Sequence, residues 1–477
     1  MAYKDLREYL HALEANGLLH RVNKEVDRDW EIAAVARVLF QRVPSQRRPA
    51  IMFENVKGFE IPVVAGVLGA SRAVYALALQ TEIDLISRRL AEAQRQPVEP
   101  VLVNTGPCKE NILTGNQIDM FKFPVPIWTV GEDPGPYITS PYVVTKDRET
   151  GVPNVGTYRV QVKGKDRIGC MMNFHQHGRK HVEMNNRLGK PTPVAVVLGT
   201  DPAIGLCSVA RMMYGLSEYA VAGGLRGEAV PLVKCETCDL EVPATAEIVI
   251  EGEIEANTLV HEGPFGEYTG YMGAAGDAFE IKIKAITHRN NPVYQAFISQ
   301  MPPSESSLIR SLGREAGLLR GLREELHLPV KDVRLKESGG AAAYLVISIR
   351  QDGSVGLSKQ VASGAWAIDP TLGKFTVLVD DDIDIWDDFA VDWAMSFRFQ
   401  PAKDCLIVPD TASVRLDPST APAEEPQLTR KRAMGSKILI DATRKHNYPP
   451  LAIPPLEHRQ KVLADAVSYG LDKLIIP

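Results

Sequence analysis

The sequence has few of the features that mark a membrane or secreted protein. No apolar run in its 477 residues approaches the roughly 20 residues that a membrane-spanning helix needs. The first residues, MAYKDLREYL, lack the basic and then apolar layout of a secretory signal. Cysteine is scarce, with six residues scattered along the chain, which indicates reduced thiols and no disulfide framework. We therefore expect a cytoplasmic protein with no membrane partner.

An excess of charge of one sign is also missing. The formal net charge is -5, and lysines and arginines are interspersed with acids, so we expect no nucleic-acid partner. The glycine-rich signatures of nucleotide-binding proteins, the HExxH motif of zinc proteases and the GxSxG motif of serine hydrolases are absent. The sequence therefore gives no support for these common classes: nucleotide-binding proteins, zinc proteases and serine hydrolases.

What the sequence does contain is a succession of helix and strand patterns long enough for two or three domains. Apolar residues recur at helical spacing over residues 6–13 and again over about residues 29–43. Short apolar runs and an alanine-rich helix that opens at Ser71 follow. This alternation predicts an N-terminal α/β domain over residues 1–110.

The next part of the chain, residues 111–305, is rich in β-branched runs separated by turn residues. Alternation over residues 279–285 and a turn at residues 290–292 predict antiparallel strands, which favour a barrel. An amphipathic linking helix is expected within residues 306–330, and strands alternating with helices predict a C-terminal α/β domain over residues 331–477. The predicted fold class is therefore multidomain α+β.

Two segments could be mistaken for metal sites. Cys235 and Cys238 in CETC have redox or half-zinc spacing, but no second cysteine or histidine pair follows at zinc-finger distance, which favours a structural role. The acidic run DDDIDIWDD at residues 380–388 could bind a cation at the end of a strand. Consecutive acids more often form a solvated surface that caps a helix.

Two polar clusters near the middle of the chain point more directly to chemistry. In NVGTYRVQ, Asn154 and Arg159 lie on a turn that feeds a strand, and Arg159 could form a two-pronged bond with a carboxylate or a surface salt bridge. In NFHQHGRKHVEM, the three residues His175, His177 and His181 could bind a divalent metal or form ordinary hydrogen bonds on a loop. For each cluster, the residues alone do not decide between the two alternatives.

The stretch HEGPFGEYTGY holds two acids, Glu262 and Glu267, on a stiff corner built from proline and glycine. Such acids could titrate as a pair or divide the work, one kept ionised by an arginine and the other raised toward neutral pH for proton transfer. The alternative is a solvated acidic turn, because exposed carboxylates are common.

Read together, several motifs resemble the UbiD family of prenylated-FMN-dependent reversible decarboxylases. They occur in the family's order along the chain: NVGTYR, FHQHGRKHVEM, LSEYAVAGGLRG, LVKCETCDLEVPATAEIVIEG, EGPFGEYTGY and SKILIDATRK. The resemblance implies a central split β-barrel that holds the flavin, flanked by an N-terminal α/β domain and a C-terminal α/β domain that mediates dimerisation. Cys238 departs from the asparagine that relatives often carry at this position.

The resemblance also implies a cofactor site. Asn154, His177 and Glu218 would hold Mn²⁺ (or Mg²⁺), which anchors the phosphate of the prenylated FMN, while His175 and His181 fall outside the ligand set. A flavin prenyltransferase would supply the cofactor, and K⁺ would be a further cation. The remaining expected flavin contacts are Gly156, Thr157, Tyr158, Arg159, Gln176 and Lys359.

The catalytic set implied by the resemblance is Glu262, Arg159 and Glu267. The substrate would form a covalent adduct with the prenylated flavin, lose CO2 and take a proton from Glu267. Arg159 would pair with Glu262 and help to orient the substrate carboxylate. An apolar pocket would keep the second acid protonated beside this charged pair.

The substrate class that follows is an aromatic, heteroaromatic or α,β-unsaturated carboxylic acid, with a heteroaromatic or hydroxyaromatic acid favoured. Arg310 and Arg314 could receive a second polar group of the substrate or be ordinary charges on a helix surface. Two other functions compete with decarboxylation: a metal-dependent hydrolase built on the three histidines, and a flavin-binding barrel protein without catalysis. The expected assembly is a homodimer or a higher homo-oligomer.

Overall fold

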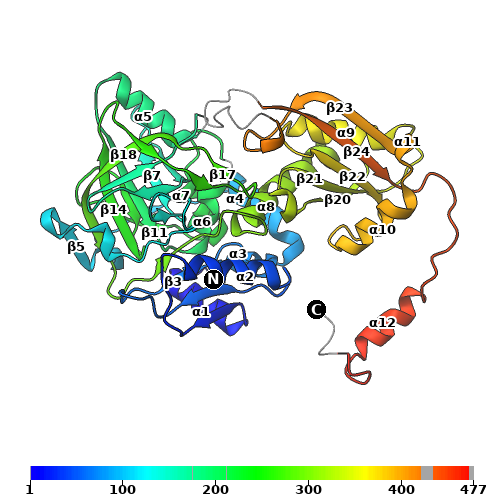
Figure 1. The fold of residues 1–477 in the computed structure, drawn as a ribbon, viewed down its shortest axis with the longest axis horizontal. Coiled ribbons are helices and arrows are strands. Elements are labelled where there is room, and N and C mark those ends of the chain that lie inside the picture. The colour runs from blue at the N-terminus through cyan, green and yellow to red at the C-terminus, as the bar shows by residue number, and fades with distance from the viewer. Residues whose placement is uncertain (1, 175, 211, 421–432, 472–477) are drawn as a thin grey trace.

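The computed structural model describes residues 2–174, 176–210, 212–420 and 433–471. Its N-terminal part lies below a large central sheet, and a second sheet, formed by the C-terminal part, lies beside both (Figure 1). No helix within these residues is both long and apolar enough to cross a membrane.

Three helices and a small sheet form the N-terminal part. Helix α1 (Leu6–Ala15) begins after Asp5, whose carboxylate accepts a hydrogen bond from the Glu8 N–H, and it buries the predicted apolar stripe. Helices α2 (Glu31–Arg42) and α3 (Arg72–Leu79) follow. The sheet has the order β1-β2-β3-β19. Its strands are β1 (Leu19–Val22), β2 (Ala50–Phe53), β3 (Val63–Ala65) and β19 (Tyr294–Gln295).

Helix α4 (Ile86–Arg95) leads from this part toward the centre. The short strand β4 (Val101–Leu102) joins a three-stranded sheet of order β13-β12-β4. Its other two strands, β12 (Pro231–Lys234) and β13 (Glu241–Pro243), are antiparallel neighbours joined by a short turn.

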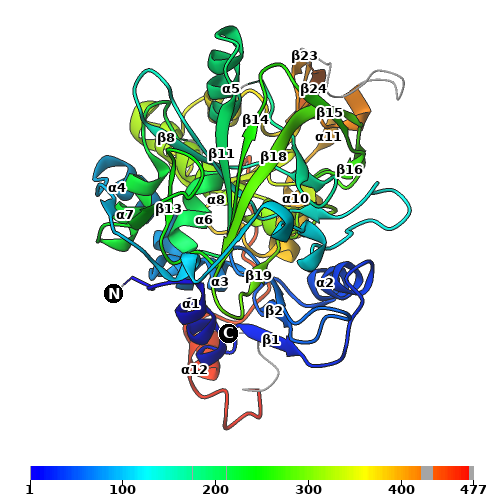
Figure 2. The ribbon, with the colours of Figure 1, turned by 90° about the vertical axis from the view of Figure 1, so that its left-hand side faces the viewer.

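The central sheet has ten strands, which follow the order β6-β9-β10-β18-β14-β11-β7-β8, with β5 and β15 also pairing with β18. Its long strands β11, β14 and β18 run side by side (Figure 2). The recorded pairings are antiparallel, as predicted. The strands are β5 (Asn111–Thr114), β6 (Tyr137–Ile138), β7 (Tyr142–Lys146), β8 (Pro153–Thr157), β9 (Val160–Val162), β10 (Arg167–Cys170), β11 (Thr192–Leu198), β14 (Ile248–Ile254), β15 (Leu259–Glu262) and β18 (Gly276–His288).

Two features of this region differ from a simple barrel of successive strands. Among the described residues the pairings form an open path from β6 to β8, so the split barrel stays a prediction. The turn at residues 290–292 does not return β18 into a hairpin. The strand after it, β19, instead pairs parallel with β3 of the N-terminal sheet, because the chain crosses to the other sheet at this point.

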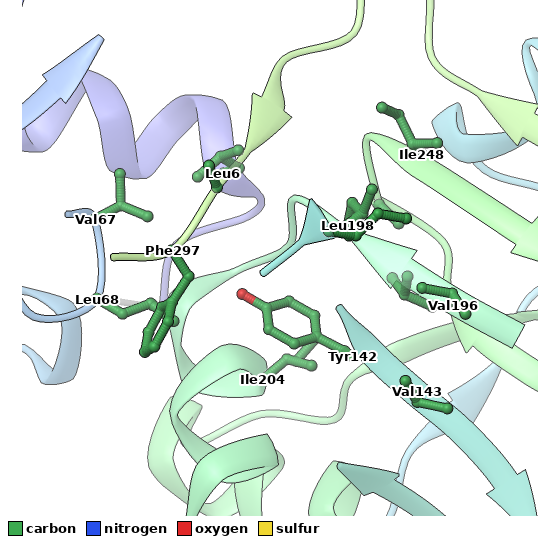
Figure 3. Close-up of a cluster of buried hydrophobic side chains, with 14 of the residues drawn as sticks. Leu6, Val67, Leu68, Tyr142, Val143, Val196, Leu198, Ile204, Ile248 and Phe297 are labelled. Carbon is green, nitrogen blue, oxygen red and sulfur yellow. The ribbon is translucent and has the colours of Figure 1, made fainter. Parts of the chain in front are cut away.

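One hydrophobic core joins the N-terminal part to the central sheet. Figure 3 shows this junction, where Leu6 and Leu68 of the N-terminal part approach Tyr142 and Leu198 of the central strands. Phe297, which follows β19, packs in the same cluster. Helices α5 (His177–Arg187), α6 (Pro202–Val209) and α7 (Glu218–Arg226) complete the central part.

The predicted linking helix is α8 (Glu305–Arg320), which continues as a π-helical turn over Gly321–Glu325. It leads into a five-stranded sheet of order β20-β21-β22-β24-β23. The strands are β20 (Val330–Leu335), β21 (Tyr344–Ile349), β22 (Phe375–Asp380), β23 (Cys405–Ala412) and β24 (Met434–Ala442). The associated helices are α9 (Leu357–Ile368), α10 (Asp388–Arg398) and α11 (Pro401–Asp404).

The acidic run at residues 380–388 is only partly the predicted solvated surface. Asp387 caps α10 by accepting a hydrogen bond from the Phe389 N–H, as expected. Asp380 is buried instead, and its carboxylate lies 2.8 Å from the Arg398 guanidinium. A buried arginine therefore pairs with this acid.

The chain after β24 forms an arm that extends away from the sheet and ends in helix α12 (Leu456–Ala464), apart from the rest of the molecule (Figure 1). Helix α12 has no buried residue. Large apolar side chains on it are exposed, including Leu456 at 61% and Leu463 at 56%. This face is available to another protein surface.

Candidate active site

Three charged side chains from separate segments meet at one place. Arg159 lies between β8 and β9, Glu262 ends β15, and Glu267 lies in the turn between β16 (Phe265–Gly266) and β17 (Met272–Gly273). The Arg159 guanidinium donates to both oxygens of Glu262, at 2.9 and 2.7 Å, and to Oε1 of Glu267 at 2.7 Å. One arginine therefore bridges the two acids of the glycine-rich corner.

Backbone conformation and close packing explain the glycines of this corner. Gly263 has a φ of +86°, and a side chain there would lie 3.0 Å from the Ala275 Cα and 3.5 Å from the Arg159 guanidinium. At Gly273 a side chain would lie 2.8 Å from the Glu267 Cγ. Only glycine adopts the first conformation at low cost and leaves space at the second position. The glycines thus let the two acids reach one guanidinium.

The two acids differ in their exposure to solvent. The Glu262 side chain is fully buried, Arg159 is 13% exposed, and Glu267 is 24% exposed. These values contradict both the solvated acidic turn and the surface salt bridge that the motifs alone left open. Breaking a buried pair of this kind leaves an uncompensated charge, so the three groups act as one unit.

The electrostatic environment also separates the roles of these groups. Burial raises the pKa of Glu267, although the positive charges of Arg159 and Arg310 oppose this effect. Burial alone would lower the pKa of Arg159, but its two carboxylate partners outweigh this effect and keep the pKa raised. The arginine is therefore charged at neutral pH, and Glu267 holds its proton to a higher pH than an ordinary glutamate.

Arg310 and Arg314, both on α8, have different surroundings. The guanidinium carbon of Arg310 lies 3.5 Å from the centre of the Tyr268 ring, one residue after Glu267. The Arg314 guanidinium donates to the Ala341 carbonyl at 3.1 Å. A side chain at Gly340 would lie 2.8 Å from the Tyr268 ring, so the C-terminal domain also contacts this turn. Of these two arginines, Arg310 is the one whose charge opposes the rise in the pKa of Glu267.

Tyr137, which no sequence motif indicates, lies beside this corner, and its hydroxyl accepts a hydrogen bond from the Gly263 N–H at 3.1 Å. Its ring packs against Phe265 with the ring centres 4.2 Å apart. Both rings are buried, as is Glu262. No local signal marks Tyr137, because it belongs to a distant strand with the composition of an ordinary core.

The expected metal ligands line one cavity. Asn154 lies on β8, while His177 and Glu218 are the first residues of α5 and α7. The Asn154 side-chain amide nitrogen donates to the Tyr158 hydroxyl at 3.1 Å, a bond that does not use its carbonyl oxygen. The Val155 N–H donates to Glu218 at 2.9 Å and fixes the carboxylate toward β8.

The protonation states at this cavity suit a divalent cation. Burial raises the pKa of Glu218 to about 7, because a charged carboxylate loses its hydration there. Burial and the charge of Lys180 lower the pKa of His177, which leaves a neutral imidazole at neutral pH. An amide oxygen, an imidazole nitrogen and a carboxylate are a donor set that Mn²⁺ or Mg²⁺ accepts. The residues therefore fit the expected metal.

The other two histidines of the cluster have different positions. His175 lies outside the described residues. His181 lines the same cavity, but its Nδ1 lies 2.9 Å from the Thr145 hydroxyl, and its Nε2 lies 4.0 Å from the Asp147 carboxylate. Burial lowers the pKa of His181 to about 4. His181 is thus a neutral histidine held by protein partners.

The expected flavin contacts fall into two groups. Tyr158 folds back over Gly156, where a side chain would lie 2.2 Å from the Tyr158 hydroxyl, and Thr157 shares a 2.8 Å hydrogen bond with Ser208. The Gln176 side chain, just before α5, accepts a hydrogen bond from the Asn173 N–H at 2.6 Å. Lys359 is exposed near the start of α9 in the C-terminal domain. Lys359 is the expected contact that lies in a different domain.

The fold and the site define a class: a multidomain protein of mixed α/β content with a buried arginine–carboxylate cluster and a separate cavity lined by Asn154, His177 and Glu218. Sequence models of three domains of 3-octaprenyl-4-hydroxybenzoate carboxy-lyase then match nearly the whole chain. The N-terminal model matches residues 10–94, the Rift-related domain residues 100–302 and the C-terminal model residues 307–442. The chain belongs to the UbiD family of carboxy-lyases, which confirms the predicted resemblance.

Solved structures agree with this assignment. The UbiD-class enzyme HmfF from Pelotomaculum thermopropionicum, in complex with FMN, is 36% identical, covers 97% of this chain and 99% of its own, and gives a TM-score of 0.85. An evolved dimeric form of HmfF in complex with prFMN is 35% identical over 95% and 98% of the two chains, with a TM-score of 0.83. Vanillic acid decarboxylase from Sedimentibacter hydroxybenzoicus is 30% identical over 98% and 100%, with a TM-score of 0.85.

Proposed function

We propose that this protein catalyses the reversible, non-oxidative decarboxylation of an aromatic, heteroaromatic or α,β-unsaturated carboxylic acid with prenylated FMN as cofactor. The bridging of Glu262 and Glu267 by Arg159 is the observation that carries this proposal. The similarity to HmfF, solved with FMN and prFMN, and to vanillic acid decarboxylase supports the cofactor and the substrate class. A heteroaromatic or hydroxyaromatic acid is the favoured substrate.

The cofactor would be held chiefly by the central domain. Asn154, His177 and Glu218 would bind Mn²⁺ or Mg²⁺, which would anchor the flavin phosphate. When bound, the prenylated flavin supplies the electron sink for the carbanion that forms as CO2 leaves. The further flavin contacts are Gly156, Thr157, Tyr158, Arg159, Gln176 and Lys359. K⁺ as a second cation, and a flavin prenyltransferase as the supplier, rest on the family resemblance.

Within this site the three charged residues would have separate tasks. Arg159 keeps its positive charge because it is bonded to Glu262, and it can attract and orient the carboxylate of the substrate. Glu267 has a raised pKa and contacts Arg159 through one oxygen only, so it can deliver a proton to the carbon that has lost CO2. In the carboxylation direction the same carboxylate removes that proton.

Replacing the proposed proton donor tests this function. We expect that wild-type protein co-expressed with a flavin prenyltransferase, with Mn²⁺ supplied, binds a coloured flavin and releases CO2 from acids in a panel of aromatic and heteroaromatic substrates. Glu267→Gln should retain the flavin absorbance and lose about 10²–10⁴-fold in turnover, which is the usual contribution of a general acid. The measurement is CO2 release on cofactor-loaded protein.

The matched control is Glu183→Gln, which changes a glutamate in a helical i,i+4 pair with Arg179, 40% exposed. It should have wild-type turnover. Flavin-loaded wild type without CO2 release from any acid would contradict the proposal. Metal-dependent hydrolysis without flavin would favour the histidine hydrolase, which the carboxy-lyase family assignment does not support. Full turnover by Glu267→Gln would leave the reaction class intact but assign the proton to another group.

Two structural parts of the proposal concern architecture and assembly. The central domain would be a split β-barrel over residues 111–305, between an N-terminal domain over residues 1–110 and, after a linking helix at residues 306–330, a C-terminal domain over residues 331–477. The protein would form a homodimer or a higher homo-oligomer through the C-terminal part. The exposed apolar face of α12 supports this assembly, because a second copy of the chain could bury it.

A further inference from the structure

A second cluster of metal-binding side chains lies at the turn between β12 and β13. Cys235 directly follows β12, Cys238 precedes β13, and the Cys235 N–H donates to the Leu240 carbonyl at 2.8 Å to close the turn. Two cysteines separated by two residues on a tight turn between antiparallel strands present both sulfur atoms to one side. This is the local geometry with which structural zinc sites begin.

The fold supplies a third ligand that the sequence did not reveal. Glu251, in the middle of β14, brings a carboxylate oxygen to the turn, and the ligand atoms of Cys235, Cys238 and Glu251 all lie within 4.8 Å of one another. Glu251 is only 1% exposed. The spacing of CETC suggested a structural role because no further cysteine or histidine pair follows; the partner is instead an acid on a different sheet.

The Glu251 carboxylate is fixed in place by the turn itself. Its Oε1 accepts from the Glu236 N–H at 2.9 Å, and its Oε2 accepts from the Thr237 N–H and the Thr237 hydroxyl, each at 2.8 Å. A carboxylate has about four acceptor sites, so these three bonds leave one site for a cation. Hydrogen bonds that orient a ligand in this way are typical of metal centres.

The charges of the cluster favour a soft divalent cation over a redox-active dithiol. Thiolates at both cysteines and a carboxylate at Glu251 would together carry three negative charges within a few ångströms. Reactive thiolates need positive surroundings, whereas here a buried carboxylate lies beside them and the nearby cation, Lys109, is paired with Glu236. A divalent cation removes this repulsion, and two sulfur ligands with one oxygen ligand select Zn²⁺ among common metals.

We propose that Cys235, Cys238 and Glu251 bind one Zn²⁺ ion, with water as the fourth ligand. Glu251 is buried, but Cys238 is partly exposed, so solvent reaches the site from the cysteine side. The ion would tie the β12–β13 turn to β14 of the central sheet. The Tyr219 hydroxyl on α7 also donates to the Glu241 carbonyl of β13 at 3.4 Å, so the same turn supports the helix that begins at Glu218.

Cobalt titration of the reduced, metal-free full-length protein tests this site. Co²⁺ bound by sulfur gives thiolate-to-metal charge-transfer absorption, which the oxygen and nitrogen ligands of the flavin metal site cannot give. We expect this absorption to saturate at one equivalent and to disappear when Zn²⁺ is added. Cys235→Ser and Cys238→Ser should each weaken or abolish it, and Glu251→Gln should lower the affinity by about tenfold or more.

Cys405→Ser is the matched control, because Cys405 is a partly exposed thiol on β23 of the C-terminal domain. It should leave the cobalt spectrum unchanged. If a cysteine variant fails to fold, alkylation of the wild type replaces it: Zn²⁺ should slow the modification of Cys235 and Cys238, read by mass spectrometry, but not that of Cys405. Absence of charge-transfer absorption, or a Cys235–Cys238 disulfide that forms equally fast with Zn²⁺ present, would overturn the proposal.

Discussion

The guanidinium of Arg159 places two chemically identical acids in different environments. Glu262 is fully buried and bonded through both oxygens, whereas Glu267 is partly exposed and bonded through one. Burial raises the pKa of Glu267, and the nearby cations limit that rise. Two acids in different environments can divide the work, one serving structure and the other proton transfer.

The raised pKa of Glu267 predicts the pH dependence of decarboxylation. The proton donor is the protonated form, so kcat should be constant at low pH and fall as the pH rises through the folded pKa, which lies above the ordinary value of about 4.3. Arg310→Gln should move this descending limb to higher pH, because the charge of Arg310 lowers the pKa of Glu267. The measurement is kcat against pH at saturating substrate.

Arg320→Gln, at the exposed end of the same helix, serves as the control and should have the wild-type profile. An Arg310→Gln profile that coincides with the wild type, or moves to lower pH, would show that another group controls the limb.

The family resemblance implied which residues form the charged cluster but not which residues surround it. Glycine and proline around Glu262 and Glu267 indicated a bend, because these residues restrict the backbone locally. Tyr137 and Glu251 carry no such signal, because each reaches its partner through strand pairing across long stretches of sequence. Local composition can indicate the shape of a turn. Which residues from other parts of the sequence lie beside that turn depends on the order of strands in the sheet.

The elements that were predicted best are the helices with a regular apolar stripe. Helix α1 buries the residues that the spacing selected, and α8 begins one residue before the predicted start. The pattern could not show that Glu305, the first residue of α8, is fully buried. Its carboxylate accepts hydrogen bonds from the N–H groups of Gly66, Leu68 and Ile298 at 2.8–3.2 Å, so it joins α8 to the N-terminal sheet region.

Removal of this carboxylate should destabilise the protein strongly. Glu305→Ala leaves three buried N–H groups without their acceptor, and each costs about 1–3 kcal/mol, so we expect the free energy of unfolding to fall by about 3 kcal/mol or more. Denaturant unfolding of the two proteins measures the difference. Glu325→Ala, near the other end of the helix and 65% exposed, should change stability by less than about 0.5 kcal/mol.

A loss for Glu305→Ala as small as that of the control would show that water or neighbouring groups replace the carboxylate.

The molecule as a whole has a shared core for its N-terminal and central parts and separate cores on the C-terminal sheet. The sequence pattern predicted alternating helices and strands at each end of the chain, and the structure confirms this mixed α/β content. It did not predict the return of β19 to the N-terminal sheet, because a two-residue strand has too little sequence to show a period. The separation of the arm from the C-terminal sheet was also missed, since α12 has ordinary helical composition.

Deletion of the arm tests its role in assembly. A chain that ends after Asn447 loses α12 and its exposed apolar side chains but keeps every strand of the C-terminal sheet. We expect the deleted protein to have a smaller oligomeric mass than the full chain, measured by light scattering or sedimentation. Its thermal midpoint at low concentration should be nearly unchanged, because α12 has no buried residue.

If the full and the shortened chain have the same oligomeric mass, the subunit interface lies on another surface. As a control, Leu456→Asp with Leu463→Asp in the full chain should reproduce the change without shortening the protein.

The contact of Tyr268 with two other parts of the molecule has a mechanical consequence. Its ring lies against the Arg310 guanidinium of α8 and against Gly340 of the C-terminal domain, and Tyr268 immediately follows Glu267. The packing of α8 and of the C-terminal domain around Tyr268 therefore helps to hold the Glu267 carboxyl group at its distance from Arg159.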